Sequence, residues 1–185
     1  MGAGAPQGTG GRERSHGGHS VTSFLSTFVN KVDRKGRVSV PAPFRAALAG
    51  DPYQGIIVYP SLTDAALDGF GRSMLEELNR RRLDKTMADG DFEQALLGGD
   101  SVVDTIMALA HELPFDGEGR IVLPDSLAAQ AKITDRATFV GRGSRFQIWS
   151  PEAFEEHQRE AVAALRARLG DGAGAPSRRT GGGAP

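Results

Sequence analysis

The chain of 185 residues contains no cysteine, so disulfide bonds and cysteine-based metal sites are excluded. It also lacks a long apolar run, since its compact apolar segment at residues 55–59 is far shorter than the roughly 20 residues of a membrane-spanning helix. The first residues show no apolar stretch of the kind found in a secretory signal peptide. These absences predict a soluble cytoplasmic protein without a membrane partner.

Sequence signatures of catalysis are missing too. The chain has no HExxH, no GxSxG and no phosphate-binding P-loop, and it shows no paired carboxylates on a pocket-like framework. His16 and His19 stand in a glycine-rich segment where no metal site is expected, and His111 has no nucleophile beside it. We therefore predict no enzymatic activity, no cofactor, no metal and no small-molecule substrate.

The net charge, −1, is close to zero and gives no overall attraction to nucleic acid. Its distribution is uneven, however. Residues 31–45 contain five basic residues and one acid, which gives a net charge of +4. Residues 114–128 contain one arginine and three acids, which gives −2. A local basic surface at residues 31–45 is therefore compatible with DNA binding.

These two windows surround an internal repeat. Residues 32–41 (VDRKGRVSVP) and 115–124 (FDGEGRIVLP) share the pattern apolar-Asp-x-x-Gly-Arg-apolar-x-apolar-Pro. Each copy predicts a strand, a tight turn with glycine at positive φ, and a second strand ended by proline, which cannot donate to a sheet. A unit of about 50 residues is marginal alone, so we expect the copies to share a core, within the chain or across subunits.

Short elements are predicted around each copy. Near the first, we expect an edge strand at 23–29, a helix at 43–48 that begins with proline, and a strand at 55–59. Near the second, we expect a helix at 125–131, a strand at 138–140, an added hairpin turn at 141–144, a strand at 146–149 and a helix from Ser150 to about Leu169.

The connecting residues 61–112 predict mainly helix. A first helix begins near Ser61 or Thr63 and continues to about residue 83. Two further helical pieces lie between residues 92 and 113, are broken by a glycine pair, and have Asp100 or Ser101 as a cap.

The two motifs and the segment 141–149 resemble the MraZ family, over roughly residues 24–165. The family carries two SpoVT-AbrB modules in one chain. The resemblance implies an α+β fold: a duplicated swapped-hairpin (SpoVT-AbrB type) β-barrel with short helices, a helical insert and a C-terminal helix. The expected divisions are a disordered tail (1–23), repeat 1 (24–72), a helical connector (73–112), repeat 2 (113–156), and a C-terminal helix with a disordered tail (157–185).

The resemblance also implies a function. Family members are sequence-specific DNA-binding transcriptional regulators that bind repeated promoter boxes on double-stranded DNA. They repress the division and cell wall gene cluster, including their own gene, and form ring-like homo-oligomers. A cytoplasmic, nucleoid-associated protein is therefore expected. Two alternatives remain: an AbrB-like antitoxin or other AbrB-type regulator with a protein partner, and a structural ring without specific DNA readout.

The cations of the first copy are the candidate DNA contacts, because DNA binding needs groups that reach phosphates and base edges. A β-ribbon carrying arginine can enter the major groove and bind guanine. The predicted set is Arg34, Lys35 and Arg37, flanked by Lys31 and Arg45. Secondary candidates are Arg120, Arg142 and Arg145.

Two interpretations of Arg37 stay open. Arg120 occupies the same place in an acidic copy, so each arginine can either contact DNA or lock its turn by pairing with Asp33 or Asp116. We interpret both aspartates as structural acceptors of turn N–H groups. The unequal charges suggest that the first turn faces DNA and that the second copy is a scaffold, available for subunit contacts.

Overall fold

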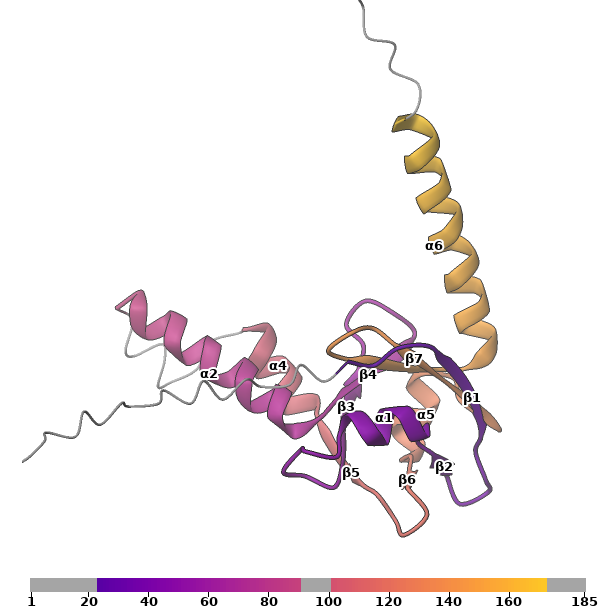
Figure 1. Cartoon of the computed structure of the whole chain (residues 1–185), viewed down its shortest axis with the longest axis horizontal. Helices are drawn as coiled ribbons and strands as arrows, with labels where there is room; N and C mark the ends of the chain where they lie inside the picture. Colours follow the sequence, from indigo (N-terminus) through magenta and orange to yellow (C-terminus); the bar gives the residue numbers. More distant parts are fainter. Residues whose placement is uncertain (1–22, 91–100, 173–185) are drawn as a thin grey trace, which may run out of the picture.

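The computed structural model describes residues 23–90 and 101–172 and has the predicted α+β class. The chain passes twice through the same order of elements (Figure 1). The first pass consists of β1 (Thr27–Lys31), β2 (Arg37–Ser39), α1 (Ala42–Ala47), β3 (Gly55–Pro60), β4 (Ala66–Phe70) and α2 (Arg72–Ala88). After α4 (Val102–Leu109), the second pass consists of β5 (His111–Pro114), β6 (Arg120–Val122), α5 (Asp125–Gln130), β7 (Arg136–Gly141), β8 (Phe146–Trp149) and α6 (Pro151–Gly172).

The two passes exchange strands. Six strands form an antiparallel sheet in the order β1-β7-β8-β4-β3-β5, so each outer strand pairs with a strand of the other pass. The remaining strands, β2 and β6, form a two-stranded ribbon with one strand from each pass. The described strands do not close into a barrel, because β1 and β5 are the two ends of the sheet.

Local signals explain many of the element boundaries. Gly36 and Gly119 have φ values of 73° and 72°, as predicted for the two turns. The hydroxyl of Ser101 accepts a hydrogen bond from the Asp104 backbone N–H and caps α4, and the Ser150 hydroxyl caps α6 in the same way. The strands, short helices and C-terminal helix predicted around the repeats are present, but the edge strand predicted at 23–29 lies at Thr27–Lys31.

The predicted helix between residue 61 and residue 70 is wrong, because Ala66–Phe70 form the central strand β4. All five residues are buried, so the strand is covered on both faces and shows no polar alternation. Gly69 lies against the ring of Phe146, where a β-carbon would have no room. A strand of this kind is easily mistaken for part of a helix.

Two further predictions need correction. The last connector helix ends at Leu109, and β5 follows it, whereas the sequence predicted helix as far as residue 113. The hairpin at residues 141–144 is no addition to the second copy, because β3 and β4 form a hairpin in the first as well. The predicted tails, and the helical piece at residues 91–100, lie outside the described residues.

The core lies between the sheet and the ribbon and is shared by both passes. Phe44 of α1 is fully buried, with its ring centroid 5.2 Å from that of Phe24 and 5.4 Å from that of Phe146. Val38 of β2 and Ile121 of β6 belong to the same cluster. The expected shared core is therefore formed within one chain, and it fixes the ribbon to the sheet.

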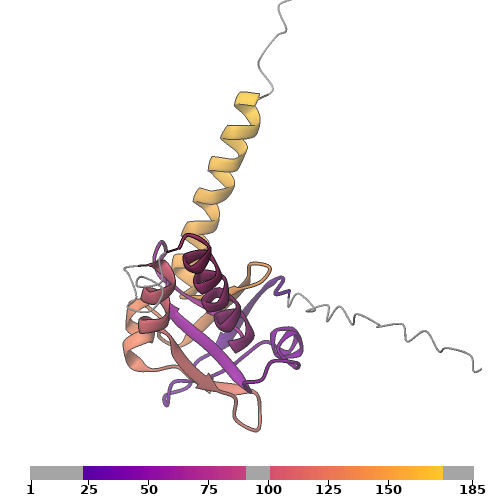
Figure 2. The ribbon, with the colours of Figure 1, turned by 90° about the vertical axis from the view of Figure 1, so that its left-hand side faces the viewer.

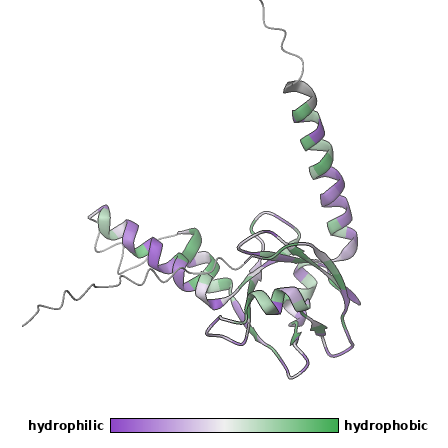
Figure 3. Cartoon of the chain, in the orientation of Figure 1, coloured by the Kyte–Doolittle hydropathy of each residue, from purple (hydrophilic) through white to green (hydrophobic). Residues whose placement is uncertain are grey.

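Helices cover the other face of the sheet. Ile106 of α4 packs with Ile57 and Phe70, while Phe154 at the start of α6 packs with Trp149. The rest of α6 leaves the body, on the side opposite the β1–β2 and β5–β6 turns (Figures 1 and 2). Apolar residues continue along this projecting part (Figure 3). Neither α2 nor α6 lies over the two turns (Figure 1).

Candidate nucleic-acid interface

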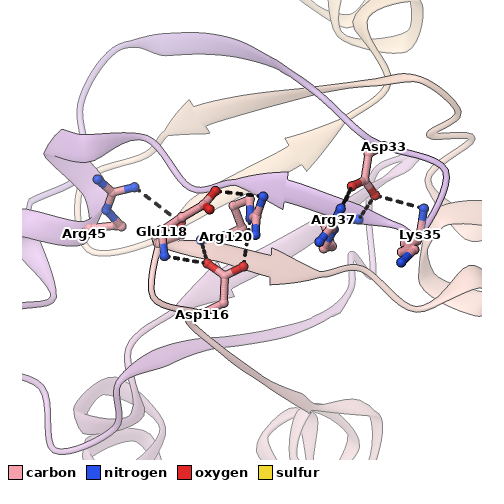
Figure 4. Close-up of polar contacts among 8 residues, drawn as sticks. Asp33, Lys35, Arg37, Arg45, Asp116, Glu118 and Arg120 are labelled. Carbon is pink, nitrogen blue, oxygen red and sulfur yellow. Dashed lines mark hydrogen bonds and ion pairs between the residues drawn. The ribbon is translucent and has the colours of Figure 1, made fainter.

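The two turns of the repeat lie at opposite ends of the β2–β6 ribbon. The strands are antiparallel, with Ser39 opposite Arg120, and each strand begins directly after its turn. Val38 and Ile121 are buried against the core, so their neighbours along each strand point to the other face. The ribbon therefore presents Arg37 near one turn and Arg120 near the other (Figure 4).

The carboxylate of Asp33 organises the first turn. Its Oδ1 accepts hydrogen bonds from the backbone N–H groups of Lys35 and Arg37, both at 2.9 Å. Its Oδ2 accepts from Nε of Arg37 at 2.7 Å and pairs with Nη2 at 2.6 Å. The Gly36 N–H donates to the Asp33 carbonyl at 3.0 Å. Arg37 thus locks this turn, which was one of its two interpretations.

The second turn has the same lock. Asp116 Oδ1 accepts from the backbone N–H groups of Glu118 and Arg120, both at 2.9 Å, and Oδ2 accepts from Arg120 Nε at 2.8 Å. Here, however, Nη1 of Arg120 also pairs with the Glu118 carboxylate at 2.8 Å. The arginine of the second turn is therefore balanced by two carboxylates, and the arginine of the first turn by one.

These hydrogen bonds favour the charged form of each aspartate. Donation from the Arg37 side chain and backbone lowers the pKa of Asp33 to about 2. Donation from the backbone and side chain of Arg120 lowers the pKa of Asp116 in the same direction, while the bond to Asp116 raises the pKa of Arg120. Both locks are therefore fully ionised at neutral pH, and both aspartates are structural, as interpreted.

The other cations of the first turn do not take part in the lock. Arg34 and Lys35 are exposed, and neither side chain has a hydrogen-bond or ion-pair partner among the described residues. The same holds for Lys31 at the end of β1. The structure thus brings three available cations together around the first turn.

Arg45 lies farther from that turn than the sequence implied. Its Nη1 donates to the carbonyls of Val40, at 3.1 Å, and Gly119, at 3.3 Å. Arg45 is half-buried and sits against the second turn, where a β-carbon on Gly119 would meet its guanidinium. Its visible role is to connect α1 with the second turn (Figure 4).

The secondary candidates Arg142 and Arg145 are engaged on the outer face of the sheet. Arg145 Nη1 pairs with the buried Asp68 carboxylate at 2.7 Å, and Gln147 Nε2 donates to the same oxygen at 3.2 Å. Arg142 Nε donates to Gln147 Oε1 at 3.1 Å. The neighbours Leu67 and Ile148 point to the core, so this network faces away from the ribbon.

Sequence reasoning missed Lys132 and Arg136, two exposed cations without a described partner. Both follow the second motif, beyond the charge windows drawn around the two copies. Only the strand register, which places Arg136 opposite Lys31, reveals that it belongs to the end of the molecule that carries the first turn.

Within residues 23–90 and 101–172, no three histidine, aspartate or glutamate side chains are grouped to hold a metal ion. No helix in this part of the chain is both long and apolar enough to cross a membrane.

The fold and the paired turns define a class: a duplicated α+β protein whose passes exchange strands around two Asp-x-x-Gly-Arg locks. A family model described as "MraZ protein, putative antitoxin-like" matches residues 106–169. The curated protein "Transcriptional regulator MraZ" of Rickettsia akari (strain Hartford) is 40% identical over 140 residues, which span 75% of this chain and 88% of that protein. Its namesake in Rickettsia rickettsii (strain Sheila Smith) is 41% identical over 136 residues, 72% of this chain and 85% of that protein. The chain belongs to the MraZ family, as the sequence resemblance implied.

Proposed function

We propose that the protein is a sequence-specific DNA-binding transcriptional regulator that contacts DNA with its first turn and the adjoining ribbon. The main observation in support of this proposal is the difference in charge between the two turns. Arg34 and Lys35 are exposed and unpaired among the described residues, whereas the equivalent positions are Gly117 and Glu118. Cations that can neutralise phosphates are thus gathered at one end of the ribbon.

The lock supports this role by fixing the backbone from which the two cations project. A preorganised turn loses less conformational entropy on binding. Arg37 can both lock the turn and contact DNA. Its Nε and Nη2 hold Asp33, while its Nη1 has no partner among the described residues, and the side chain is 37% exposed. In this proposal Arg37 locks the turn and uses its remaining N–H groups for a phosphate or a guanine edge.

One basic turn supplies few phosphate contacts, so a monomer would bind DNA weakly. We propose that a ring-like homo-oligomer engages repeated promoter boxes, because linked sites raise the effective concentration of each turn. The proposed targets are the division and cell wall gene cluster and the protein's own gene, which it would repress as a cytoplasmic, nucleoid-associated protein. We also propose that the exchanged strands are a SpoVT-AbrB swapped-hairpin arrangement, with repeats at residues 24–72 and 113–156.

Charge reversal tests the assignment. We would measure binding of the full chain to its own promoter fragment and to a scrambled fragment over a series of salt concentrations. The double variant Arg34→Glu with Lys35→Glu should abolish retention of the promoter fragment at every salt concentration. The matched control is Arg166→Glu with Arg168→Glu, because both arginines are exposed on α6 and unpaired among the described residues.

The outcomes separate clearly. Wild-type binding by the Arg34 and Lys35 double variant would remove the first turn from the DNA surface. Equal retention of promoter and scrambled fragments by the wild type would contradict specific readout. Circular dichroism of each variant checks that loss of binding is not loss of fold.

A further inference from the structure

Two cations face each other across the outer strands of the sheet, beside the first turn. Lys31 ends β1 and Arg136 begins β7, and the antiparallel register places them directly opposite. Both are exposed, and neither has a hydrogen-bond or ion-pair partner in the described part of the chain. Directly opposed residues have β-carbons about 5 Å apart, so the two charges are close.

This pair is unfavourable in the protein alone, since like charges directly opposite one another destabilise a strand pair. No described carboxylate forms an ion pair with either cation. Asp33 is paired with Arg37, and Asp135, which precedes Arg136, accepts a hydrogen bond from the Thr134 hydroxyl at 3.2 Å but reaches neither Lys31 nor Arg136 as an ion-pair partner. Among the described residues neither cation therefore has an ion-pair partner, and an anionic ligand could take that place.

The other end of the sheet shows that the fold does not need the pair. There, β5 pairs with β3 as β1 pairs with β7, and Pro114 lies opposite Gly55. The backbone bonds just beyond these strands also correspond: the Val32 N–H donates to the Asp135 carbonyl at 2.8 Å, and the Phe115 N–H to the Gln54 carbonyl at 2.9 Å. The same backbone thus forms with no charge at either position.

The pair is also placed to act with the first turn. Lys31 is separated from Asp33 by a single residue, so the strand leads directly into the lock. Arg136 comes from the second pass, yet strand exchange brings it to this end of the molecule. Cations of both passes therefore lie at the end of the molecule that carries the first turn.

We propose that Lys31 and Arg136 together bind one phosphate of the DNA backbone, so that the second pass contributes directly to the DNA surface. A phosphate between them replaces a repulsion with two charge-assisted contacts, and the fork of Arg136 matches phosphate geometry. The inference rests on the proposed DNA-binding function and extends it to a residue outside the repeated motif. A backbone contact of this kind strengthens binding without selecting a sequence.

The test is a salt series with Arg136→Gln, using the promoter fragment and a scrambled fragment. The slope of log K against log salt should become shallower by about 1, and affinity should fall several-fold on both fragments. Arg136→Lys should keep the wild-type slope, and Arg166→Gln on α6 is the matched control. Without DNA, Arg136→Gln should melt no lower than the wild type, because a repulsion is relieved.

Two results would overturn the proposal: a wild-type slope and affinity for Arg136→Gln, or a melting temperature below that of the wild type, which would indicate a structural role. Either leaves the proposed function standing if the Arg34 and Lys35 double variant still loses DNA. If the wild type itself retains no DNA, the proposed function and the phosphate site are both contradicted.

Discussion

The first and second turns of this protein share a lock but differ in what surrounds it. In each, one aspartate accepts two backbone N–H groups and the Nε of the arginine four residues later. The first lock is flanked by cations that have no partner in the described part of the chain, whereas in the second lock the arginine also pairs with the Glu118 carboxylate. The geometry is therefore a requirement of the fold, while the charge is free to differ.

The difference extends beyond the turns into the sheet. The strand pair next to the first turn carries Lys31 and Arg136, and its counterpart at the other end carries Pro114 and Gly55. Described cations without an ion-pair partner thus lie at the first turn and its strand pair, whereas the corresponding positions of the second turn and its strand pair carry none. Duplication within one chain allows this, since two identical subunits could not assign different charges to equivalent positions.

The largest expected effect comes from giving the first turn the residues of the second. Arg34→Gly with Lys35→Glu removes two cations and adds a carboxylate that can pair with Arg37, as Glu118 pairs with Arg120. Two lost charge-assisted contacts predict roughly 100-fold weaker binding to the promoter fragment, measured by fluorescence anisotropy at fixed salt. The lock uses none of the replaced side chains, so the melting temperature should stay near the wild-type value.

The reverse change sharpens the same comparison. Gly117→Arg with Glu118→Lys should raise affinity for DNA of any sequence about tenfold, by adding cations and releasing Arg120 from one carboxylate. Unchanged affinity in both exchanges would mean that the charge difference between the turns does not decide which end faces DNA.

The two turn glycines should differ in their tolerance of a side chain. Both have positive φ, which costs alanine about 1–2 kcal/mol. At Gly36 a β-carbon would also lie 2.8 Å from the carbonyl oxygen of Leu123, whereas at Gly119 it would meet the movable guanidinium of Arg45. Urea unfolding should therefore give a loss of about 2–3 kcal/mol for Gly36→Ala and about 1–2 kcal/mol for Gly119→Ala. Equal losses would show that the close contact at Leu123 relaxes without cost.

Arg145 should behave as a support of the sheet. Arg145→Ala leaves the buried Asp68 carboxylate with Gln147 and no cation. Because Arg145 itself is 48% exposed, we expect a loss of about 2 kcal/mol of stability, less than for a fully buried pair. Asp68→Asn in the same chain should recover part of it. The salt slope of DNA binding should not change, and a shallower slope would return Arg145 to the DNA contacts.

The smallest effect is the response of the locks to acid. The pKa of Asp33 lies at about 2, below its ordinary value of 3.8, so the ionised carboxylate stabilises the fold above roughly pH 4. This contribution is lost as the pH falls through 3.8 towards 2. Carboxyl chemical shifts in an NMR titration should show Asp33 and Asp116 both titrating below 3.8. A midpoint at the ordinary value for either would mean that its lock is open in solution.

The sequence predicted what depends on neighbouring residues and missed what depends on distant ones. Turn glycines, caps and short helices follow from local chemistry, and they were confirmed. Strand β4 was not predicted, because burial on both faces removes the alternation of apolar and polar residues that identifies a strand. Part of its cover comes from distant residues, such as Phe146 of β8 on one face and Ile106 of α4 on the other.

The candidate site shows the same division. Charge at the first turn was visible in the sequence, and so was the aspartate that could lock Arg37. The engagement of Arg45 with the Gly119 carbonyl, and of Arg145 with Asp68, joins residues more than 70 positions apart. The position of Arg136 opposite Lys31 follows only from the register of β1 on β7. Motif spacing carries no information about such pairs.

The exchange of strands also has a consequence for how the molecule is made. Because β1 pairs with β7 and β2 with β6, the first strands to leave the ribosome must wait for partners synthesised near the other end of the chain. Until then β1 has open edges, and Val29 within it and Leu25 just before it are apolar side chains that stay exposed even in the finished fold. We expect a nascent or truncated first pass to be prone to aggregation, and the completed chain to fold slowly and as one unit.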